Sequence, residues 1–291
     1  MPVQVTRDRK IYSFARGLEP AVTVDPGETV VFQTNDCYDG QVRLEGEELS
    51  TESVQPGYCN PATGPVAVKG ALPGDMLVVS IEGISIASRG LIFGSDRHGR
   101  NVRGWPVDIV DGRAKLPGGV LRPVDTVIGV IGVSPAGEAV PNSTPGDHGG
   151  NLDTPDVKAG STVYLPVTEA GGMLAMGDLH ALQGDGEASG QGVEIAGEVT
   201  ARVQVMKGSI ADWPVIRTPT HWSVVASGED LDAAVEAALL RGRDFLISRL
   251  DVKDSVAAVL LSTVCDVRIS QVVNPLQTVR VCIPQDLVPV W

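Results

Sequence analysis

The sequence predicts a mainly β protein, built of sandwich-like or barrel-like sheets, with a smaller α+β portion near the C-terminus. Val-rich apolar runs of strand length recur from about residue 21 to residue 228. The 34 glycines and 20 prolines are numerous, and many stand between these runs as turns. Apolar residues at helical spacing appear only late in the chain, from about residue 227.

The first half is expected to consist of strands. AVTVDPGETVVFQT (21–34) has two apolar runs around a turn at Pro26-Gly27, and GPVAVKGALPGDMLVVSIEGISI (64–86) repeats this design around Pro73-Gly74. PVDTVIGVIGV (123–133) adds a further strand, whose internal glycines suit a β-bulge.

Strands continue in the second half. STVYLPV (161–167) and GGMLAMGDLHAL (171–182) are predicted to form a strand pair, joined by a turn at residues 170–172. VEIAGEVTARVQVMKG (193–208) alternates apolar and polar residues over part of its length, which is typical of a half-buried strand. THWSVVASG (220–228) is another short strand.

The helical portion follows these strands. SGEDLDAAVEAALLRGRDFLISRL (227–250) carries apolar residues at helical spacing and acidic residues at its start, although Gly242 weakens its continuity. A second helix from about Asp254 and a strand RISQVV (268–273) complete the chain. We expect one unit over residues 1–291, which could subdivide into a β-rich part (1–140) and a site-bearing part with the α+β segment (141–291).

The net charge argues against several classes of partner. With 23 basic and 36 acidic residues the formal charge is −13, so the surface repels nucleic acid and anionic lipid, whereas a neutral or cationic small substrate is compatible with it. No apolar run approaches the ~20 residues that span a bilayer, and the N-terminal MPVQVTRDRKIYSF lacks a signal-peptide core. We therefore expect a cytoplasmic protein with free thiols; the pairs Cys37–Cys59 and Cys265–Cys282 leave disulfides open.

Two neighbouring motifs carry most of the chemistry. In DHGGNLD (147–153), His148 and Asp153 flank Gly149-Gly150, whose flexible backbone could curl both side chains around one centre; the alternative is an ordinary turn. In MGDLHALQGDGE (176–187), Asp178 and His180 would share one face of a strand and form a clamp suited to Zn²⁺.

The loop after this clamp adds two further acids, Asp185 and Glu187. The alternative is a polar turn with His180 hydrogen-bonded in the core. This alternative is weaker, because three carboxylates and a histidine so close in sequence would repel one another without a cation or shared protons.

NDCYDGQV (35–42) is a third candidate. Asp36 and Asp39 follow a strand and could add a carboxylate to a metal centre, although the motif alone favours a strand-terminating turn. Cys37 has no positive neighbour that would lower its pKa, so we expect an unreactive thiol. His98 and His221 are isolated in the sequence and are not expected to be ligands. The chain contains no G-x-G-x-x-G, P-loop or G-x-S-x-G motif.

Together, NDCYDGQV, PATGPVAVKGALPGDMLVVSI, DHGGNLDTPDVKAGSTVYLPV and GDLHALQGDGEASGQGVEI resemble the acetamidase/formamidase family of amide hydrolases. The resemblance runs over most of the chain. It implies a mostly β fold and hydrolysis of a short aliphatic amide, such as formamide or acetamide, to a carboxylate and ammonia. It also implies a metal-dependent cytoplasmic protein that forms homo-oligomers, dimers or larger. Zinc is the expected metal, and a second, structural ion such as Ca²⁺ could be present.

The family's polar motifs fall on six residues of this sequence: Asp36, His148, Asp153, Asp178, His180 and Glu187. We hypothesise that Asp36, His148, Asp153 and His180 bind the metal. Glu187 would act as general base and then acid, and Asp178 would orient His180 or share its role. The amides of Gly149 and Gly150 would hold the developing oxyanion.

Two other functions stay open. The same chemistry could act on a lactam, a urea derivative or a larger amide, because the pocket walls decide the substrate and the sequence does not identify them. The protein could also be a non-catalytic β-rich module that binds a metal or a small molecule.

Overall fold

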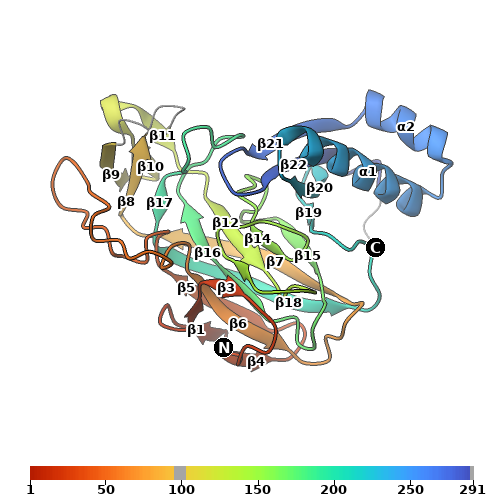
Figure 1. Ribbon diagram of the computed structural model, residues 1–291, viewed down its shortest axis with the longest axis horizontal. Coiled ribbons are helices and arrows are strands. Elements are labelled where there is room, and N and C mark those ends of the chain that lie inside the picture. The colour runs from red at the N-terminus through yellow and green to blue at the C-terminus, as the bar shows by residue number, and fades with distance from the viewer. Residues whose placement is uncertain (95–102, 289–291) are drawn as a thin grey trace.

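The computed structural model describes residues 1–94 and 103–288 and confirms a mainly β fold with two helices near the C-terminus (Figure 1). His98 lies outside the described residues. The described strands form two large sheets and one two-stranded sheet. Neither of the helices in the described ranges combines the length and the apolar character needed to cross a membrane.

The first large sheet has nine strands and is antiparallel except where β1 pairs with β5. In spatial order its strands are β1 (Val3–Val5), β5 (Thr29–Thr34), β18 (Gly197–Met206), β7 (Met76–Ile86), β15 (Thr162–Pro166), β19 (Val215–Arg217), β20 (His221–Gly228), β22 (Gln277–Pro284) and β21 (Asp266–Gln271).

The second large sheet has eleven strands. Its main path runs through β11 (Leu121–Pro123), β10 (Arg113–Lys115), β9 (Arg103–Val110), β8 (Arg89–Gly94), β17 (Glu194–Ile195), β16 (Leu174–His180), β12 (Val127–Gly132) and β14 (Gly149–Asn151). A branch from β16 adds β6 (Ala62–Val68), β2 (Lys10–Ile11) and β4 (Val22–Val24). The small sheet pairs β3 (Ser13–Phe14) with β13 (Val140–Pro141), and a 3₁₀ turn spans Pro117–Gly119.

The strands on either side of the predicted turns exist, but they enter different sheets. β4 and β5 flank Pro26-Gly27, and β6 and β7 flank Pro73-Gly74; in each case the chain crosses from the second sheet to the first. The predicted pairing of β15 with β16 is wrong, because β15 lies between β7 and β19 whereas β16 pairs with β12, β17 and β6. Both large sheets combine strands from either side of residue 140.

One apolar core joins the two large sheets. Phe32 and Val199 of the first sheet and Ile128 and Leu174 of the second belong to the same cluster of buried side chains. Each such side chain contributes roughly 1.5–3 kcal/mol by leaving water. This packing fixes β12 and β16 in the interior, where Asp178 and His180 of β16 are also removed from water.

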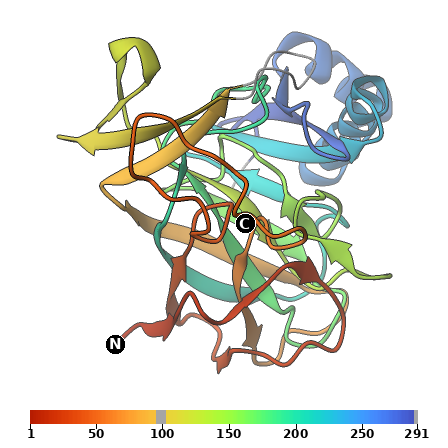
Figure 2. The same cartoon turned by 60° about the vertical axis from the view of Figure 1, so that its left-hand side comes forward.

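The two helices cover the end of the first sheet. α1 (Leu231–Leu250) begins at Asp230, whose side chain accepts the Ala233 amide at 2.8 Å, and it packs on β20 and β22. Gly242 does not interrupt α1; a Cβ there would lie 3.1 Å from Val281, so the glycine allows a close approach to β22. α2 (Asp254–Thr263) follows at the predicted position. The helices lie on the opposite side of the molecule from strands β9–β11 (Figure 2).

Candidate active site

A buried cluster of acids surrounds one histidine at the centre of the second sheet. Its members are between 1% and 6% exposed: Asp153, Asp178, His180, Glu187 and Glu194. Asp178 and His180 belong to β16, and Glu194 lies opposite His180 on β17. All five line a cavity of about 170 Å³. The structure therefore brings together four of the residues predicted from sequence and adds Glu194.

Glycine makes room for two of these carboxylates. A Cβ at Gly129 of β12 would lie 2.5 Å from Asp153 Oδ1 and 3.0 Å from Asp178 Oδ2. The same glycine faces an irregular point of β16, where Asp178 has a positive φ of 55°. The register of β12 against β16 is unbroken across Gly129, so the bulge expected from the glycines of this strand is absent from this pairing; the glycine instead leaves space for the acids.

Backbone strain concentrates at the cluster. Asp153, Asp178 and Glu187 have φ values of 40°, 55° and 44°, in the left-handed region that non-glycine residues rarely adopt. Such conformations cost on the order of 1–3 kcal/mol each and recur at active sites, where the surrounding structure holds them in place. The strain is therefore consistent with a site at which geometry is selected over stability.

The proton on His180 can be assigned from its neighbour Gln183. The amide nitrogen of Gln183 donates to the Asp153 carbonyl at 2.7 Å, so its Oε1 faces His180 Nδ1 at 3.0 Å and must accept. Nδ1 therefore carries the proton. His180 Nε2 is directed at three carboxylates, 3.3 Å from Glu194, 3.6 Å from Asp178 and 4.0 Å from Asp153.

Burial and the neighbouring carboxylates raise the pKa of three acids in the cluster. Burial and the nearby Asp153 raise the pKa of Glu187 to about 10, and burial also raises the pKa of Glu194 to about 8 and that of Asp153 to about 6. Burial lowers the pKa of His180, but the surrounding carboxylates, led by Glu194, outweigh this and hold it well above its ordinary value. The cluster therefore requires protons or a cation.

The donor atoms fit a divalent cation. Asp153 Oδ1, Asp178 Oδ1 and Glu194 Oε2 are buried and have no hydrogen-bond partner among the described residues. The ligand atoms of Asp153, His180 and Glu187 lie within 4.8 Å of one another. Carboxylate oxygen and imidazole nitrogen are ligands that Zn²⁺ accepts.

Two asparagines orient the carboxylates. Asn60 Nδ2 donates to Asp178 Oδ2 at 2.9 Å, and Asn274 Nδ2 donates to Asp153 Oδ2 at 2.6 Å. Each bond occupies one oxygen and leaves the Oδ1 atom free to face His180. Such outer partners are typical of metal sites.

Asp36 forms local hydrogen bonds, and its predicted ligand role stays a prediction without support from this geometry. Its Oδ1 accepts the amides of Tyr38 at 2.9 Å and Gly40 at 3.1 Å, so it closes the turn after β5, which was the alternative for this motif. Within the described ranges it joins no group of three candidate ligands. The Cys37 thiol lies nearby, and burial followed by the Glu194 charge raises its pKa well above the ordinary value, in line with the unreactive thiol expected.

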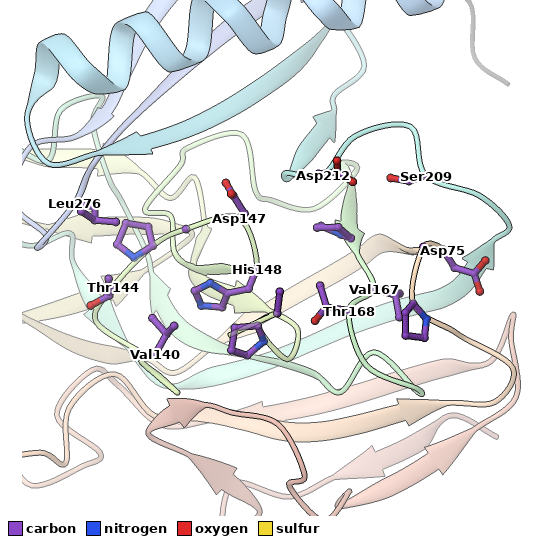
Figure 3. Close-up of a pocket in the computed structure, with 17 residues that line it drawn as sticks. Asp75, Val140, Thr144, Asp147, His148, Val167, Thr168, Ser209, Asp212 and Leu276 are labelled. Atoms are coloured by element: carbon purple, nitrogen blue, oxygen red, sulfur yellow. The ribbon is translucent and has the colours of Figure 1, made fainter. Parts of the chain in front are cut away.

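His148 lies outside the cluster. Its imidazole lines a separate, larger cavity (Figure 3), and it belongs to no group of three candidate ligands in the described part of the chain. The amide of Gly149 donates to the Gly146 carbonyl at 3.0 Å and is not free for an oxyanion. A ligand role for His148 and an oxyanion role for Gly149-Gly150 stay predictions, without support from this geometry.

A separate group of candidate metal ligands, centred on Asp156, already has hydrogen-bond and ion-pair partners within the protein. Asp156 Oδ2 accepts Ser223 Oγ at 2.6 Å and Arg280 Nε at 2.8 Å, and lies 3.1 Å from His221 Nε2. Cys282 completes this group. The guanidinium supplies the positive charge there, and Ca²⁺ prefers oxygen ligands, so the predicted second ion gains no support from this group. His221 is partly buried and hydrogen-bonded, and all four cysteines are free.

Few sequence signals mark the remaining site residues. Glu194 was recognisable only as a charge between Val193 and Ile195, both of them buried. Asn60 and Asn274 are brought in by pairing of distant segments, for which a single sequence offers no marker.

Comparison with known proteins supports a common architecture. The model of the "Acetamidase/Formamidase family" matches residues 8–105 and 126–289. The structure superposes on an acetamidase from Bacillus halodurans with a TM-score of 0.93 at 39% identity, covering 97% of each chain. It also superposes on a protein described as a predicted acetamidase/formamidase from Thermoanaerobacter tengcongensis with a TM-score of 0.92 at 37% identity, covering 98% of this chain and 96% of that one.

The match to curated sequences is more distant. An acetamidase from Mycolicibacterium smegmatis is 26% identical over 271 residues, which cover 68% of this chain and 66% of that protein. The chain spans no more than two thirds of the length of the curated relatives it matches. The family model nevertheless covers most of the sequence, and it includes every member of the buried cluster. The chain belongs to the acetamidase/formamidase family.

Proposed function

We propose that this protein hydrolyses a short aliphatic amide, formamide or acetamide, to a carboxylate and ammonia. The family supports the reaction class. The observation that carries the proposal is the set of three unpartnered carboxylate oxygens around His180 in a cavity of about 170 Å³. A cavity of this volume suits a substrate of a few heavy atoms, since drug-sized ligands occupy roughly 300–1,000 Å³.

A divalent cation, with zinc as the first choice, would be held by His180 Nε2 and the carboxylates of Asp153 and Asp178. Glu194 could be a further ligand, because its carboxylate lies within 4.8 Å of the Asp178 carboxylate and the Cys37 thiol. Such an ion polarises an amide carbonyl and makes a water molecule easier to deprotonate. The protonated Nδ1 of His180, held by Gln183, leaves Nε2 with the lone pair that coordinates.

Glu187 moves the proton. Its carboxylate accepts a proton from the water whose oxygen forms a bond to the carbonyl carbon. The resulting carboxylic acid then donates that proton to the amide nitrogen as the C–N bond breaks and ammonia leaves. Burial and the neighbouring Asp153 favour the protonated form of Glu187, which suits the second of these transfers.

Asn151 supplies a group that could recognise the substrate. It lines the same cavity, it is 3% exposed, and its Oδ1 has no partner among the described residues. A carboxamide nitrogen can donate to this oxygen, whereas an ester or a carboxylate cannot. Only a bound amide would thus pair the buried Asn151 Oδ1 with a donor, and this difference would select amides over esters and carboxylates.

The experiment measures ammonia release from formamide, acetamide and hexanamide, and ring opening of 2-pyrrolidinone to 4-aminobutanoate, before and after chelation and zinc add-back. The proposal expects release from the two small amides, its loss on chelation and its return with zinc. Ammonia release from hexanamide alone, or ring opening of the lactam alone, would replace the substrate class. Release that is unchanged in a preparation shown by elemental analysis to be free of metal would overturn the role of the cation. The family resemblance also leads us to propose a cytoplasmic homo-oligomer. Light scattering would measure its mass in solution.

A further inference from the structure

A second and larger cavity is lined by none of the described residues that line the proposed reacting site. Its volume is about 760 Å³, and four prolines together with Val140, Val167 and Leu276 make its wall largely apolar. Figure 3 shows the His148 imidazole in the midst of the side chains that line it. Cavities of this size and character hold small organic ligands.

His148 carries a polar atom without a partner beside this cavity. The residue is 6% exposed, and its Nε2 is buried with no hydrogen-bond partner among the described residues. Leaving such an atom unpaired is unfavourable, because it has given up its hydrogen bonds to water. The atom therefore points to a missing partner rather than to a satisfied core histidine.

Packing holds the imidazole in place without a hydrogen bond. The ring meets Phe14 edge to face, with centroids 5.2 Å apart. A Cβ at Gly150 would lie 2.9 Å from Nε2, and one at Gly146 would lie 3.2 Å from Nδ1, so the bare backbone closes around both sides of the ring. The side chain is thus preorganised, which lowers the entropy cost of binding a ligand.

The charges around the cavity argue against an anionic ligand. The described lining residues include three aspartates and no lysine or arginine. Asp75 and Asp147 are paired with Lys207 at 2.8 Å and Arg241 at 2.7 Å, and Asp212 has no described partner. Burial lowers the pKa of His148 to about 4, so the ring is neutral at pH 7 and offers no positive charge.

We propose that this cavity is a second ligand site, which takes an uncharged, largely apolar molecule with one hydrogen-bonding group directed at the His148 imidazole. The apolar wall supplies the contact area, and the imidazole, which can either donate or accept, fixes the orientation of the ligand. The site shares a wall with the proposed reacting site, because Ser143 lines one cavity and Thr144 the other. Its existence does not depend on amide hydrolysis.

Binding can be measured by ¹⁹F NMR on the full chain with two probes of matched shape, 4-fluorobenzyl alcohol and 4-fluorobenzoate, and with 6-fluorohexanol as a neutral aliphatic probe. At least one alcohol should bind saturably, and the benzoate should bind at least tenfold more weakly. His148→Phe keeps a ring in the cavity and removes Nε2. Loss of one hydrogen bond, worth about 1 kcal/mol, should weaken alcohol binding about fivefold.

Val140→Trp tests the cavity without altering His148, because it fills part of the space. It should abolish alcohol binding, while Val259→Trp, at a position that is 60% exposed on α2, should leave it unchanged. The proposal would be overturned if neither alcohol bound saturably, if the benzoate bound as well as the alcohols, or if alcohol binding survived both His148→Phe and Val140→Trp.

Discussion

Arg280 donates to Asp185 from Nη2 at 2.7 Å, and this bond joins strand β22 to the loop that carries Glu187. The same guanidinium donates from Nε to Asp156 at 2.8 Å. Asp185 lies two residues before Glu187, and Asp156 lies three residues after Asp153. One buried cation therefore fixes two segments that each bring an acid into the cluster.

Replacing Arg280 should disturb both stability and turnover. Arg280→Met leaves His221 as the remaining positively charged partner of the Asp156 carboxylate and should cost about 3–5 kcal/mol in the free energy of unfolding, measured with denaturant. Arg280→Lys keeps the charge but cannot bond Asp156 and Asp185 together, so it should retain more stability yet lower kcat for the amide. Arg202→Lys, in an exposed pair with Glu82, is the control and should change stability by less than about 1 kcal/mol. Wild-type kcat in Arg280→Lys would contradict this positioning role.

Glu187→Gln should abolish most of the hydrolysis while it preserves the fold. The amide keeps the shape of the side chain but cannot accept and return a proton, so kcat should fall by roughly 10²–10⁴-fold. Circular dichroism and elemental analysis should show the fold and bound metal unchanged. Glu198→Gln, on β18 and outside the cavity, should retain activity. A Glu187→Gln variant within twofold of wild type would remove Glu187 from the proton transfers.

Metal content should distinguish the role of His180 from that of His148. His180→Ala removes the only imidazole nitrogen in the described part of the cluster and should lower the bound metal per chain, measured by elemental analysis. His148→Ala should leave that ratio unchanged, because its imidazole lines the other cavity. If His148→Ala lost metal and His180→Ala did not, the assignment from geometry would be reversed.

Gly129→Ala should impair the cluster directly. The new methyl group would lie 2.5 Å from Asp153 Oδ1 and 2.9 Å from the Asp178 carbonyl, so the acids must move. Overpacking of this kind typically costs about 1–3 kcal/mol, and kcat should fall as well. Gly137→Ala is the matched control, because a Cβ there meets nothing within 4 Å and its backbone is not left-handed. Equal activity and stability in the two variants would show that the space at Gly129 is not needed.

The sequence could predict what depends on local pattern. The Val-rich runs give the strands, and the apolar spacing of residues 231–250 gives α1. Asp153, Asp178, His180 and Glu187 could be grouped because all four lie within a segment of 35 residues, 153–187, that is rich in glycine turns.

Long-range pairing accounts for what could not be predicted. β15 and β16 adjoin in sequence, yet the chain passes from one sheet to the other between them, and only the partner strands determine this. Asn274 reaches Asp153 from the far end of the chain for the same reason. The left-handed backbone at Asp153 and Glu187 is imposed by this packing, since neither residue type requires it. His148 and Asp153 are close in sequence but reach different cavities, because strand β14 extends between them.

The pair formed by Asp156 and His221 should make stability depend on pH. The hydrogen bond to Asp156 is the main cause that raises the pKa of His221 to about 9 from an ordinary value near 6.5. Because the folded state favours the protonated ring, the pair stabilises the fold fully below about pH 6.5 and loses this contribution as the pH rises through about 9. The Cys282 thiol also faces the ring and strengthens the effect.

Denaturant unfolding of wild type and His221→Gln at pH 6 and pH 9.5 measures this linkage. The variant should be less stable than wild type at pH 6, and the difference should shrink at pH 9.5, where the wild-type ring is neutral. Titrations elsewhere in the molecule, including those of the buried acids, are common to both proteins and cancel in the comparison. A difference that is equal at both pH values would show that the contact between His221 and Asp156 is a neutral hydrogen bond, and a difference that grows with pH would reverse the sign of the linkage.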